Sequence, residues 1–253
     1  MNWKNHKEYL GKQLTIDFYE KGLIKTWYRD KPLGWHLVSG LWSPLYIQLR
    51  PLSSFPELFK ATFTAMGQMV HQEAQEVNHL IGIAMAGIPL AVGISIYLGM
   101  PVAYTRKLEG IQTMNDAKHL FAEYGEHAFI EGKITPGDRI GLVDDLVTKF
   151  SSKKIALEII QHEVKRLNIG NVLVNHIFVA FDRGQKTEEE SKKEGVHLHS
   201  LISFKDQGIE WLRERLHGIE YEVISHYLEF PEKFQDKAVQ EELRRAAEND
   251  NPT

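Results

Sequence analysis

The sequence contains no cysteine, which excludes disulfide bonds, thiolate nucleophiles and cysteine-ligated zinc or iron–sulfur sites. Long apolar runs are also missing, because glycines and prolines interrupt residues 80–105, the most apolar region. That region is too punctuated to span a bilayer. The opening residues MNWKNHKEYL are polar and lack the apolar stretch of a signal peptide. We therefore expect a cytoplasmic protein without a membrane partner.

Charge of one sign is also scarce. The formal net charge is −4, with acids and bases mixed along the chain, so there is no electrostatic reason to expect nucleic-acid binding. What the sequence does have is material for a core: 253 residues, of which 43% are hydrophobic. This suits one large α/β domain, or a domain with a small appendage.

Short apolar segments alternate with helical ones from residue 80 onward. Strands are expected at 80–85, 101–106, 139–145, 171–182 and 196–204, with helices at 88–99, 152–168 and 186–194 between them. Such alternation predicts an α/β fold with a mainly parallel five-stranded sheet flanked by helices. In these sheets, ligands bind at the carboxyl ends of the strands.

Other segments lie outside the alternation. We expect helices at 4–28 and 56–78 and a strand or hairpin at 44–49. The connection at 108–136 is too long for a compact turn, which is typical of a lid or binding loop. Residues 206–253 are charged and helical, and they predict a C-terminal extension.

The segment IGLVDDLVTKFSSK (140–153) combines an apolar strand, two adjacent acids, a loop and a helix start. Two neighbouring carboxylates at a strand end suit vicinal ribose hydroxyls, which can donate to both. The backbone N–H groups at the start of the helix can hold a phosphate, and Ser151 and Ser152 can add hydroxyl donors or cap the helix. The segment therefore suggests a ribose-5-phosphate cradle. Two alternatives stay open: Asp144 and Asp145 are ordinary strand-end acids, or magnesium ligands in an unrelated α/β protein.

The same segment is similar to the phosphoribosyl-diphosphate signature V-D-D-x-x-T of type I phosphoribosyltransferases. More specifically, residues 34–205 resemble the orotate phosphoribosyltransferase family. The ordered matches are LVSGLWSPLY (37–46), GIPLA (87–91), Arg106-Lys107, Asp182-Arg183 and GVHLHS (195–200). This resemblance implies a type I phosphoribosyltransferase-like domain over 1–205, with an N-terminal hood region at 1–50, followed by the C-terminal helical extension at 206–253.

The resemblance also implies a reaction. The family transfers the phosphoribosyl group of phosphoribosyl diphosphate to orotate, giving orotidine monophosphate and pyrophosphate, a step of pyrimidine biosynthesis. Magnesium is the expected cofactor, held mainly by the diphosphate, and a homodimer is the expected assembly. The partners are phosphoribosyl diphosphate and orotate or a related base.

Roles for single residues follow from the resemblance alone. Asp144 and Asp145 are expected to hold the ribose hydroxyls, and Arg106 and Lys107 to meet the pyrophosphate. Lys107, Asp144 and Asp145 are the expected catalytic residues. The remaining expected substrate contacts are Thr148, Ser151 and Ser152 at the 5-phosphate and nearby orotate groups, Arg183 at the orotate carboxylate, and main-chain groups around Tyr46 at the pyrimidine ring. We interpret His197 and His199 as structural or surface residues.

Several positions depart from the family pattern. Val38 and Ala86 stand where the family has lysines, and Lys149-Phe150 replaces the glycine-containing turn, so that Phe150 is expected to reshape or close the phosphate cradle. Lys118 and His119 could replace the cations of the family's mobile loop. A second hypothesis therefore stays open: a catalytically altered protein of this fold that binds a nucleotide or phosphorylated sugar as a regulator, or acts on another base. An unrelated doubly wound enzyme is a third, weaker one.

Overall fold

The computed structural model describes residues 2–37, 40–106, 129–184 and 187–250. The chain divides into two compact units. Unit 1 comprises Met1–Leu10 and Ser53–Leu201, and unit 2 comprises Gly11–Leu52 and Ile202–Thr253. The sequence did not predict this division, in which residues from both ends of the chain share one unit. Among the described residues, no helix combines the length and apolar character that a membrane crossing requires.

Unit 1 is built around a six-stranded sheet with the order β10-β9-β8-β5-β6-β7. Its elements are the first residues of α1 (Trp3–Glu20), then α2 (Pro56–Glu73), β5 (His79–Gly82), α3 (Gly87–Leu98), β6 (Val102–Thr105), β7 (Ile130–Glu131), β8 (Arg139–Val147), α5 (Ser151–Arg166), β9 (Leu173–Asp182), α6 (Thr187–Lys193) and most of β10 (His197–Ser203). The central neighbours β6, β5, β8 and β9 are parallel, as expected.

The predicted number of five strands was wrong. The sixth strand, β7, pairs antiparallel with β6 through Tyr104 with Glu131 and Thr105 with Ile130. It lies inside the segment that the sequence assigned wholly to a long connection. A strand of two residues carries too little alternation for a sequence pattern to reveal it.

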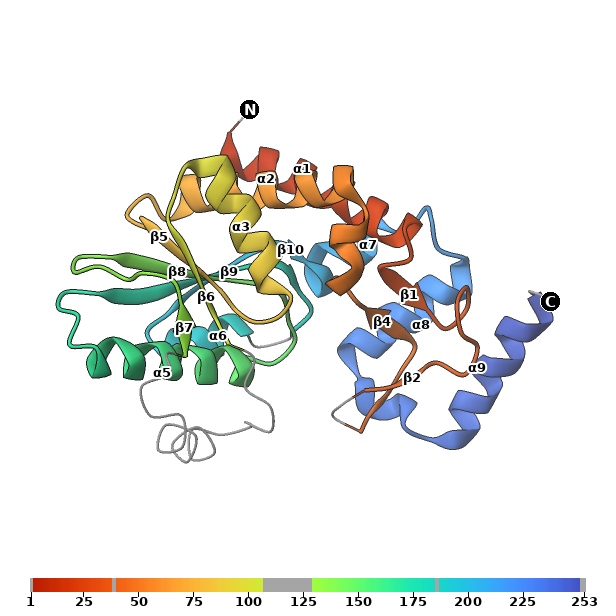
Figure 1. Ribbon diagram of the computed structural model, residues 1–253. Coiled ribbons are helices and arrows are strands. Elements are labelled where there is room, and N and C mark those ends of the chain that lie inside the picture. The colour runs from red at the N-terminus through yellow and green to blue at the C-terminus, as the bar shows by residue number, and fades with distance from the viewer. Residues whose placement is uncertain (1, 38–39, 107–128, 185–186, 251–253) are drawn as a thin grey trace. The chain divides into compact units, whose positions relative to one another are not determined.

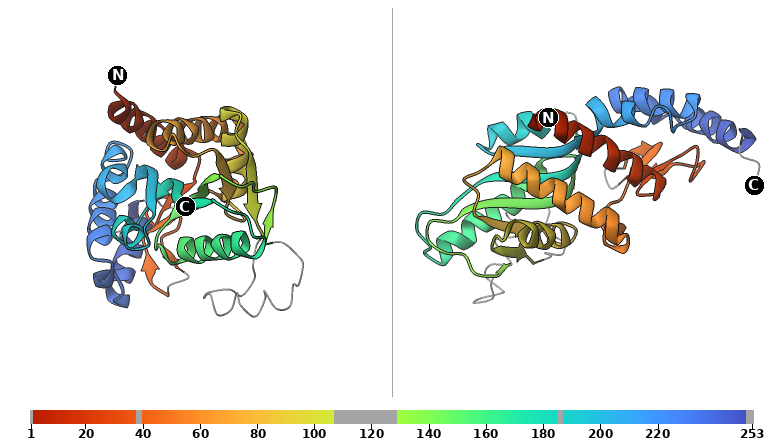
Figure 2. Two further views of the ribbon diagram at one scale, coloured as in Figure 1. Left: turned by 90° about the vertical axis from the view of Figure 1, so that its left-hand side faces the viewer. Right: turned by 90° about the horizontal axis from the view of Figure 1, so that it is seen from above.

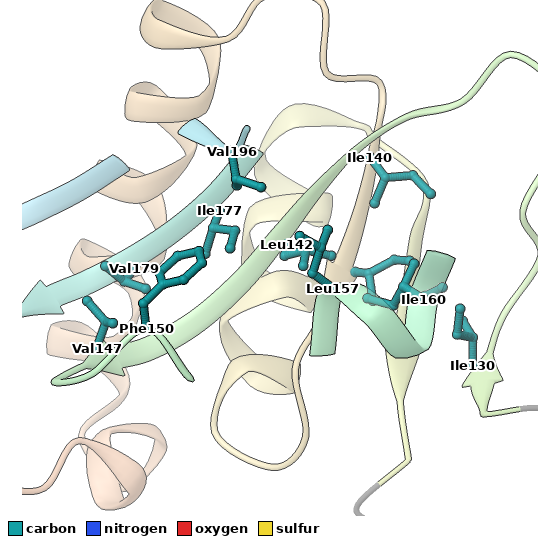
Figure 3. Packing of buried hydrophobic residues seen from close by; sticks show 12 residues of the cluster. Ile130, Ile140, Leu142, Val147, Phe150, Leu157, Ile160, Ile177, Val179 and Val196 are labelled. Atoms are coloured by element: carbon teal, nitrogen blue, oxygen red, sulfur yellow. The ribbon is translucent and has the colours of Figure 1, made fainter. Parts of the chain in front are cut away.

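Helices cover both faces of this sheet, with α5 on one face and α2 and α3 on the other (Figures 1 and 2). The core between sheet and α5 is apolar: Leu142, Ile177 and Val179 of the strands pack with Leu157 and Ile160 of the helix (Figure 3). On β8, Ile140 and Leu142 both belong to this core. Since strand residues alternate between faces, the next even position, 144, also faces α5.

Unit 2 contains residues from both ends of the chain. Its elements are the rest of α1, β1 (Ile24–Thr26), β2 (Trp35–His36), β3 (Trp42–Ser43), β4 (Leu45–Ile47), most of the 3₁₀ turn η1 (Arg50–Ser54), the π-helical turn η2 (Phe204–Gly208), α7 (Ile209–Trp211), α8 (Gly218–Glu229), the 3₁₀ turn η3 (Pro231–Phe234) and α9 (Lys237–Asp250). Strand β1 pairs antiparallel with β4, and β2 with β3.

Buried aromatic residues join the two chain segments of unit 2. Trp27 is fully buried beside Ala247 of α9, and Trp42 packs against Tyr227 of α8. The backbone N–H of Trp42 also donates to Oε1 of Gln235 at 2.8 Å. The C-terminal helices are therefore part of the core of this unit.

Candidate functional site

The two adjacent acids of the motif lie near the carboxyl end of β8. Asp144 is buried and Asp145 is partly buried. The third residue of α5, Lys153, is only 4% exposed, and its Nζ forms an ion pair with Oδ2 of Asp144. The other oxygen of Asp144, Oδ1, accepts the backbone N–H of Asp145 at 2.9 Å. We call Asp144, Asp145 and Lys153 the acid cluster; the sequence analysis did not single out Lys153.

The two carboxylates are not electrostatically equivalent. Burial raises the pKa of Asp145 to about 7, the nearby Asp144 adds to the rise, and Lys153 opposes it. One cation faces two acids, so the cluster carries a surplus negative charge when both acids are ionised. Bringing two carboxylates together without a second cation is costly, which leaves one acid able to gain from a ligand that donates hydrogen bonds.

The start of helix α3 lies very close to the backbone of β8. Helix α3 begins at Gly87, and a Cβ atom there would lie 2.1 Å from the carbonyl oxygen of Val143 and 3.0 Å from Cα of Asp144. Only glycine fits at this distance. The GIPLA segment therefore places the start of α3 directly against the backbone of the acid cluster.

The loop after β8 presents polar groups to solvent. Thr148, Ser151 and Ser152 are all exposed, and α5 begins at Ser151. The backbone N–H of Phe150, at the N-terminal end of that helix, donates to Oε2 of Glu190 of α6 at 3.0 Å. A carboxylate thus lies at the helix start where the sequence predicts a phosphate.

The expectation that the side chain of Phe150 closes the phosphate cradle was wrong, and a reshaped cradle stays a prediction. Phe150 is 2% exposed and packs into the core of unit 1 with Val147, Ile177 and Val179 (Figure 3). A position in the sequence does not reveal whether a side chain points to the ligand or to the core. Here the apolar ring gains more from the core beneath α5 than it would from a polar loop.

The structure brings Arg183 to the same end of the sheet as the acid cluster. In the parallel register of β8 and β9, Val147 lies beside Asp182, and the backbone N–H of Arg183 donates to the carbonyl of Val147 at 2.9 Å. The Asp182 carboxylate accepts the N–H of Gly184 at 2.7 Å and the hydroxyl of Thr187 at 2.6 Å. This fixes the turn that carries Arg183.

Arg106 follows β6, and its guanidinium is engaged within the β6–β7 pair. Its Nε donates to Oε1 of Glu131 at 2.6 Å, and its Nη2 forms an ion pair with the same carboxylate. The side chain is 41% exposed, so this pair is screened by solvent and readily exchanged. Lys107, Lys118, His119 and Val38 lie outside the described residues. Ala86, the other lysine departure, is partly buried just before α3.

Tyr46 belongs to unit 2, where it stacks on Trp35 with ring centroids 5.7 Å apart. It is partly buried in strand β4, and its backbone pairs with Lys25 of β1. The structure thus gives the local setting of Tyr46 but does not relate it to the acid cluster.

A second polar cluster occupies another part of unit 1. Nε2 of His176 lies 2.8 Å from Oε1 of Glu76, and Nδ1 of His176 lies 3.0 Å from Nε2 of His199. Nδ1 of His199 lies 2.8 Å from Oε2 of Glu73, whose Oε1 accepts from Nζ of Lys7 at 2.8 Å. We call these five residues the histidine chain. His197 stacks on His176 with ring centroids 5.1 Å apart.

The hydrogen bonds of the histidine chain determine how many protons its two rings must carry. Three consecutive hydrogen bonds with a carboxylate at each end need three hydrogens, and two neutral imidazoles carry only two. The chain is complete when the two rings together hold one extra proton. Burial lowers the pKa of His176 despite its contact with Glu76. Each carboxylate of the chain, Glu73 and Glu76, has a histidine ring as a hydrogen-bonding partner, and Glu73 also has Lys7.

The part of the chain that the structure describes contains no group of three or more histidine, aspartate or glutamate side chains arranged to hold a metal ion. Neither the acid cluster nor the histidine chain has such an arrangement.

No protein-family profile matches the chain. Among curated proteins, it is 32% identical over 174 residues to an orotate phosphoribosyltransferase of Dinoroseobacter shibae, covering 67% of this chain and 69% of that protein. It is 31% identical over 196 residues to one of Saccharolobus solfataricus, covering 76% and 87%.

Solved structures show the same fold. The chain is similar to Leishmania donovani UMP synthase with a TM-score of 0.69 at 21% identity, covering 87% of this chain and 42% of that one. It is similar to orotate phosphoribosyltransferase from Aeropyrum pernix with a TM-score of 0.59 at 22% identity, covering 80% and 97%. The type I phosphoribosyltransferase fold expected from the motif is confirmed.

Proposed function

The chain belongs to the orotate phosphoribosyltransferase family, and we propose that it transfers the phosphoribosyl group of phosphoribosyl diphosphate to orotate at the carboxyl end of β8. The observation that carries this proposal is the acid cluster, in which one acid is charge-matched and its neighbour is not. The products are orotidine monophosphate and pyrophosphate. As a phosphoribosyltransferase, the protein is a glycosyltransferase of pyrimidine nucleotide synthesis.

The chemistry of the transfer suits an acidic site without a nucleophilic side chain. As the bond from C1′ to the pyrophosphate oxygen breaks and a bond from C1′ to an orotate nitrogen forms, positive charge develops on the ribose and negative charge on the leaving group. Catalysis then requires orientation and charge stabilisation. We propose that the acid cluster accepts hydrogen bonds from the ribose hydroxyls, which fixes C1′ and places carboxylate charge near the ribose.

The groups around the acid cluster fit the remaining parts of the substrates. Thr148, Ser151 and Ser152 are exposed where the α5 N-terminus can favour a 5-phosphate. We propose that Arg183 pairs with the orotate carboxylate and that Arg106 exchanges Glu131 for pyrophosphate oxygens. The roles of Lys107 at the pyrophosphate and of main-chain groups around Tyr46 at the pyrimidine ring are proposed from the family resemblance alone.

Magnesium is proposed as the cofactor. When bound, it would neutralise negative charge on the diphosphate. Because Mg²⁺ at phosphate sites usually keeps phosphate oxygens and water as most of its ligands, we propose that the ion arrives with the diphosphate substrate.

A homodimer is also proposed, and an exposed apolar stretch of α3 supports it. Val92 and Ile96 lie one helical turn apart and are 38% and 76% exposed, and the neighbouring Tyr97 is 45% exposed. We expect Ile96→Asp to lower the assembly state measured by light scattering after gel filtration. Leu167→Asp, at an exposed apolar position beyond α5, is the matched control. A dimer unaffected by Ile96→Asp would place the interface elsewhere.

The activity is tested by following orotate absorbance in the ultraviolet with phosphoribosyl diphosphate and magnesium. We expect consumption of orotate by the native protein and loss of that consumption in the double variant Asp144→Asn with Asp145→Asn. Circular dichroism checks that the double variant is folded. No turnover at high protein concentration would contradict the proposed transfer.

The engagement of Arg106 by Glu131 and of the α5 N-terminus by Glu190 favours a second candidate. In it, the protein binds a nucleotide or phosphoribosyl ligand without this transfer, as a regulator, or acts on another base. Calorimetric binding of phosphoribosyl diphosphate or nucleoside monophosphates without orotate turnover would support it, and binding of none of them would remove it. The domain division at residue 205 and a cytoplasmic location stay predictions.

A further inference from the structure

Lys153 occupies a position in α5 that an apolar residue would ordinarily fill. Together with Ala156, Leu157 and Ile160 it forms the i, i+3, i+4, i+7 stripe of the helix, and all four residues are buried. A lysine is almost never buried this deeply unless its ammonium group is paired. The partner of this ammonium group is Asp144.

The contacts of Asp144 leave it poorly placed to serve a ligand. Its Oδ2 is bound to Lys153 and its Oδ1 accepts the backbone N–H of Asp145. It also faces α5, since it continues the series Ile140 and Leu142 on the strand. Asp145, the next residue, is more exposed than Asp144, and its carboxyl group is hydrogen-bonded to the Asp144 side chain.

We propose that Lys153 is a positioning residue that holds Asp144 as a buried anchor and leaves Asp145 as the acid that accepts the ribose hydroxyls. The proposal rests on the proposed function, because the ribose is that of phosphoribosyl diphosphate. It assigns unequal roles to two acids that the sequence motif presents as a pair.

The charged groups that act on Asp145 are Asp144 of its own strand and Lys153 of α5. The β9 residues opposite Asp144 and Leu146 are the apolar Val179 and Phe181. On the other side, β5 ends at Gly82 beside Val143, and the start of α3 contributes the backbone of Gly87. Glu190 of α6 is engaged by the backbone N–H of Phe150. Lys153 is the single cation among these groups, so its removal and the removal of Asp144 have opposite effects on Asp145.

Opposite shifts in pH dependence provide the test. Binding of phosphoribosyl diphosphate is measured from pH 5.5 to 9 by calorimetry, and KM and kcat are measured where orotate turnover is present. The acid limb is the pH range in which the affinity falls because Asp145 gains a proton. In Lys153→Met we expect this limb to move up by about one to two pH units. We also expect a KM at pH 7 about 10-fold higher, a smaller change in kcat, and a return of KM toward the native value near pH 9. In Asp144→Asn we expect the limb to move down, because Lys153 then faces Asp145 alone.

Two controls separate charge from structure. Lys153→Arg retains the cation and is expected to keep the native pH limb. Lys154→Met removes the neighbouring lysine, which pairs with Glu194 on the surface at 2.6 Å, and is expected to change neither KM nor the limb. Melting temperatures of all variants show which are folded, and Asp144→Asn keeps the proposal testable if Lys153→Met does not fold.

The outcomes are distinguishable. Limbs unchanged in both Lys153→Met and Asp144→Asn would overturn the positioning role, as would a loss of affinity in Asp144→Asn equal to that in Asp145→Asn. Native binding without orotate turnover would refute the proposed transfer, while the binding limbs would still decide the role of Lys153. Absence of phosphoribosyl diphosphate binding in the native protein would refute both.

Discussion

The acid cluster and the histidine chain are both networks of titratable groups in unit 1, but they differ in whether each carboxylate has a side-chain partner that stabilises its charge. In the histidine chain, Glu76 has His176 as its partner, Glu73 has His199 and Lys7, and the two rings contact each other. In the acid cluster, Lys153 balances Asp144, and Asp145 stays in surplus with a pKa raised to about 7 by burial and by Asp144. A network that closes by itself stabilises the fold, whereas one with an unmatched acid has something to gain from a ligand.

The largest expected effect is on the activity, and it follows from a change in the acid cluster. Asp145→Asn removes the carboxylate that accepts the ribose hydroxyls. Since each hydrogen bond to a charged group contributes roughly 1.5–3 kcal/mol, we expect kcat/KM for phosphoribosyl diphosphate to fall about 100-fold or more. The measurement is initial-rate orotate consumption. Activity within a few-fold of the native value would mean that Asp145 is not the acceptor.

The next effect is on stability, and it distinguishes the apolar core around Phe150 from the acid cluster. Phe150→Ala removes a ring buried among Val147, Ile177 and Val179 (Figure 3), so we expect a loss of about 3–5 kcal/mol in the free energy of unfolding. Urea denaturation measures it. Lys149→Ala, at the exposed neighbouring position, is the control and should change little. If Phe150→Ala instead improved phosphoribosyl-diphosphate binding at unchanged stability, the ring would belong to the cradle after all.

A substitution in the histidine chain should change the stability of the fold and leave the activity unchanged. Burial alone raises the pKa of Glu73, but hydrogen bonds from His199, Lys7 and Trp3 outweigh it and lower the pKa to about 2. Ionised Glu73 therefore stabilises the fold above its usual pKa of 4.5, and that stability is lost as pH falls toward 2. We expect Glu73→Gln to cost about 3 kcal/mol at pH 7 and progressively less toward pH 2, as measured by thermal melts at a series of pH values.

Orotate turnover at saturating substrate, at a temperature where Glu73→Gln remains folded, should match the native rate. A large fall in turnover there would connect the histidine chain to the active site and remove the contrast between the two networks.

The smallest effect concerns Glu190 at the start of α5. Its carboxylate accepts the backbone N–H of Phe150 and adds negative charge where the 5-phosphate is proposed to bind. A charge at a helix N-terminus contributes about 0.3–1 kcal/mol, so Glu190→Gln should lower KM for phosphoribosyl diphosphate about two- to five-fold. Glu189→Gln, one residue earlier on the same exposed helix, is the matched control and should leave KM unchanged.

The sequence predicted those parts of the fold that local patterns encode. The apolar runs of β5, β6, β8, β9 and β10 were each placed to within about three residues of the observed strands. The acid pair was recognisable because it directly follows an apolar run that predicts a strand. The union of Gly11–Leu52 with Ile202–Thr253 in one unit could not be predicted, since it depends on contacts between distant segments and not on local periodicity.

Within the site, side-chain direction was the limit. Phe150 stands in place of the glycine-containing turn that the resemblance implies, and only the packing of α5 shows that the ring turns inward. Lys153 can be recognised in the sequence because it interrupts the apolar stripe that continues through Ala156, Leu157 and Ile160. A lysine on the buried stripe of a helix that follows two acids predicts a buried ion pair.

The contrast between the two networks is tested most directly by the sign of two stability changes in the ligand-free protein. Because the pKa of Asp145 is raised from 3.8 to about 7, its ionisation destabilises the fold as pH rises through that range. At pH 8 we predict that Asp145→Asn raises the free energy of unfolding by about 2–4 kcal/mol, whereas Glu73→Gln lowers it. A urea titration of both variants beside the native protein measures these changes. Destabilisation by both substitutions would contradict the claim that Asp145 lacks a matching cation.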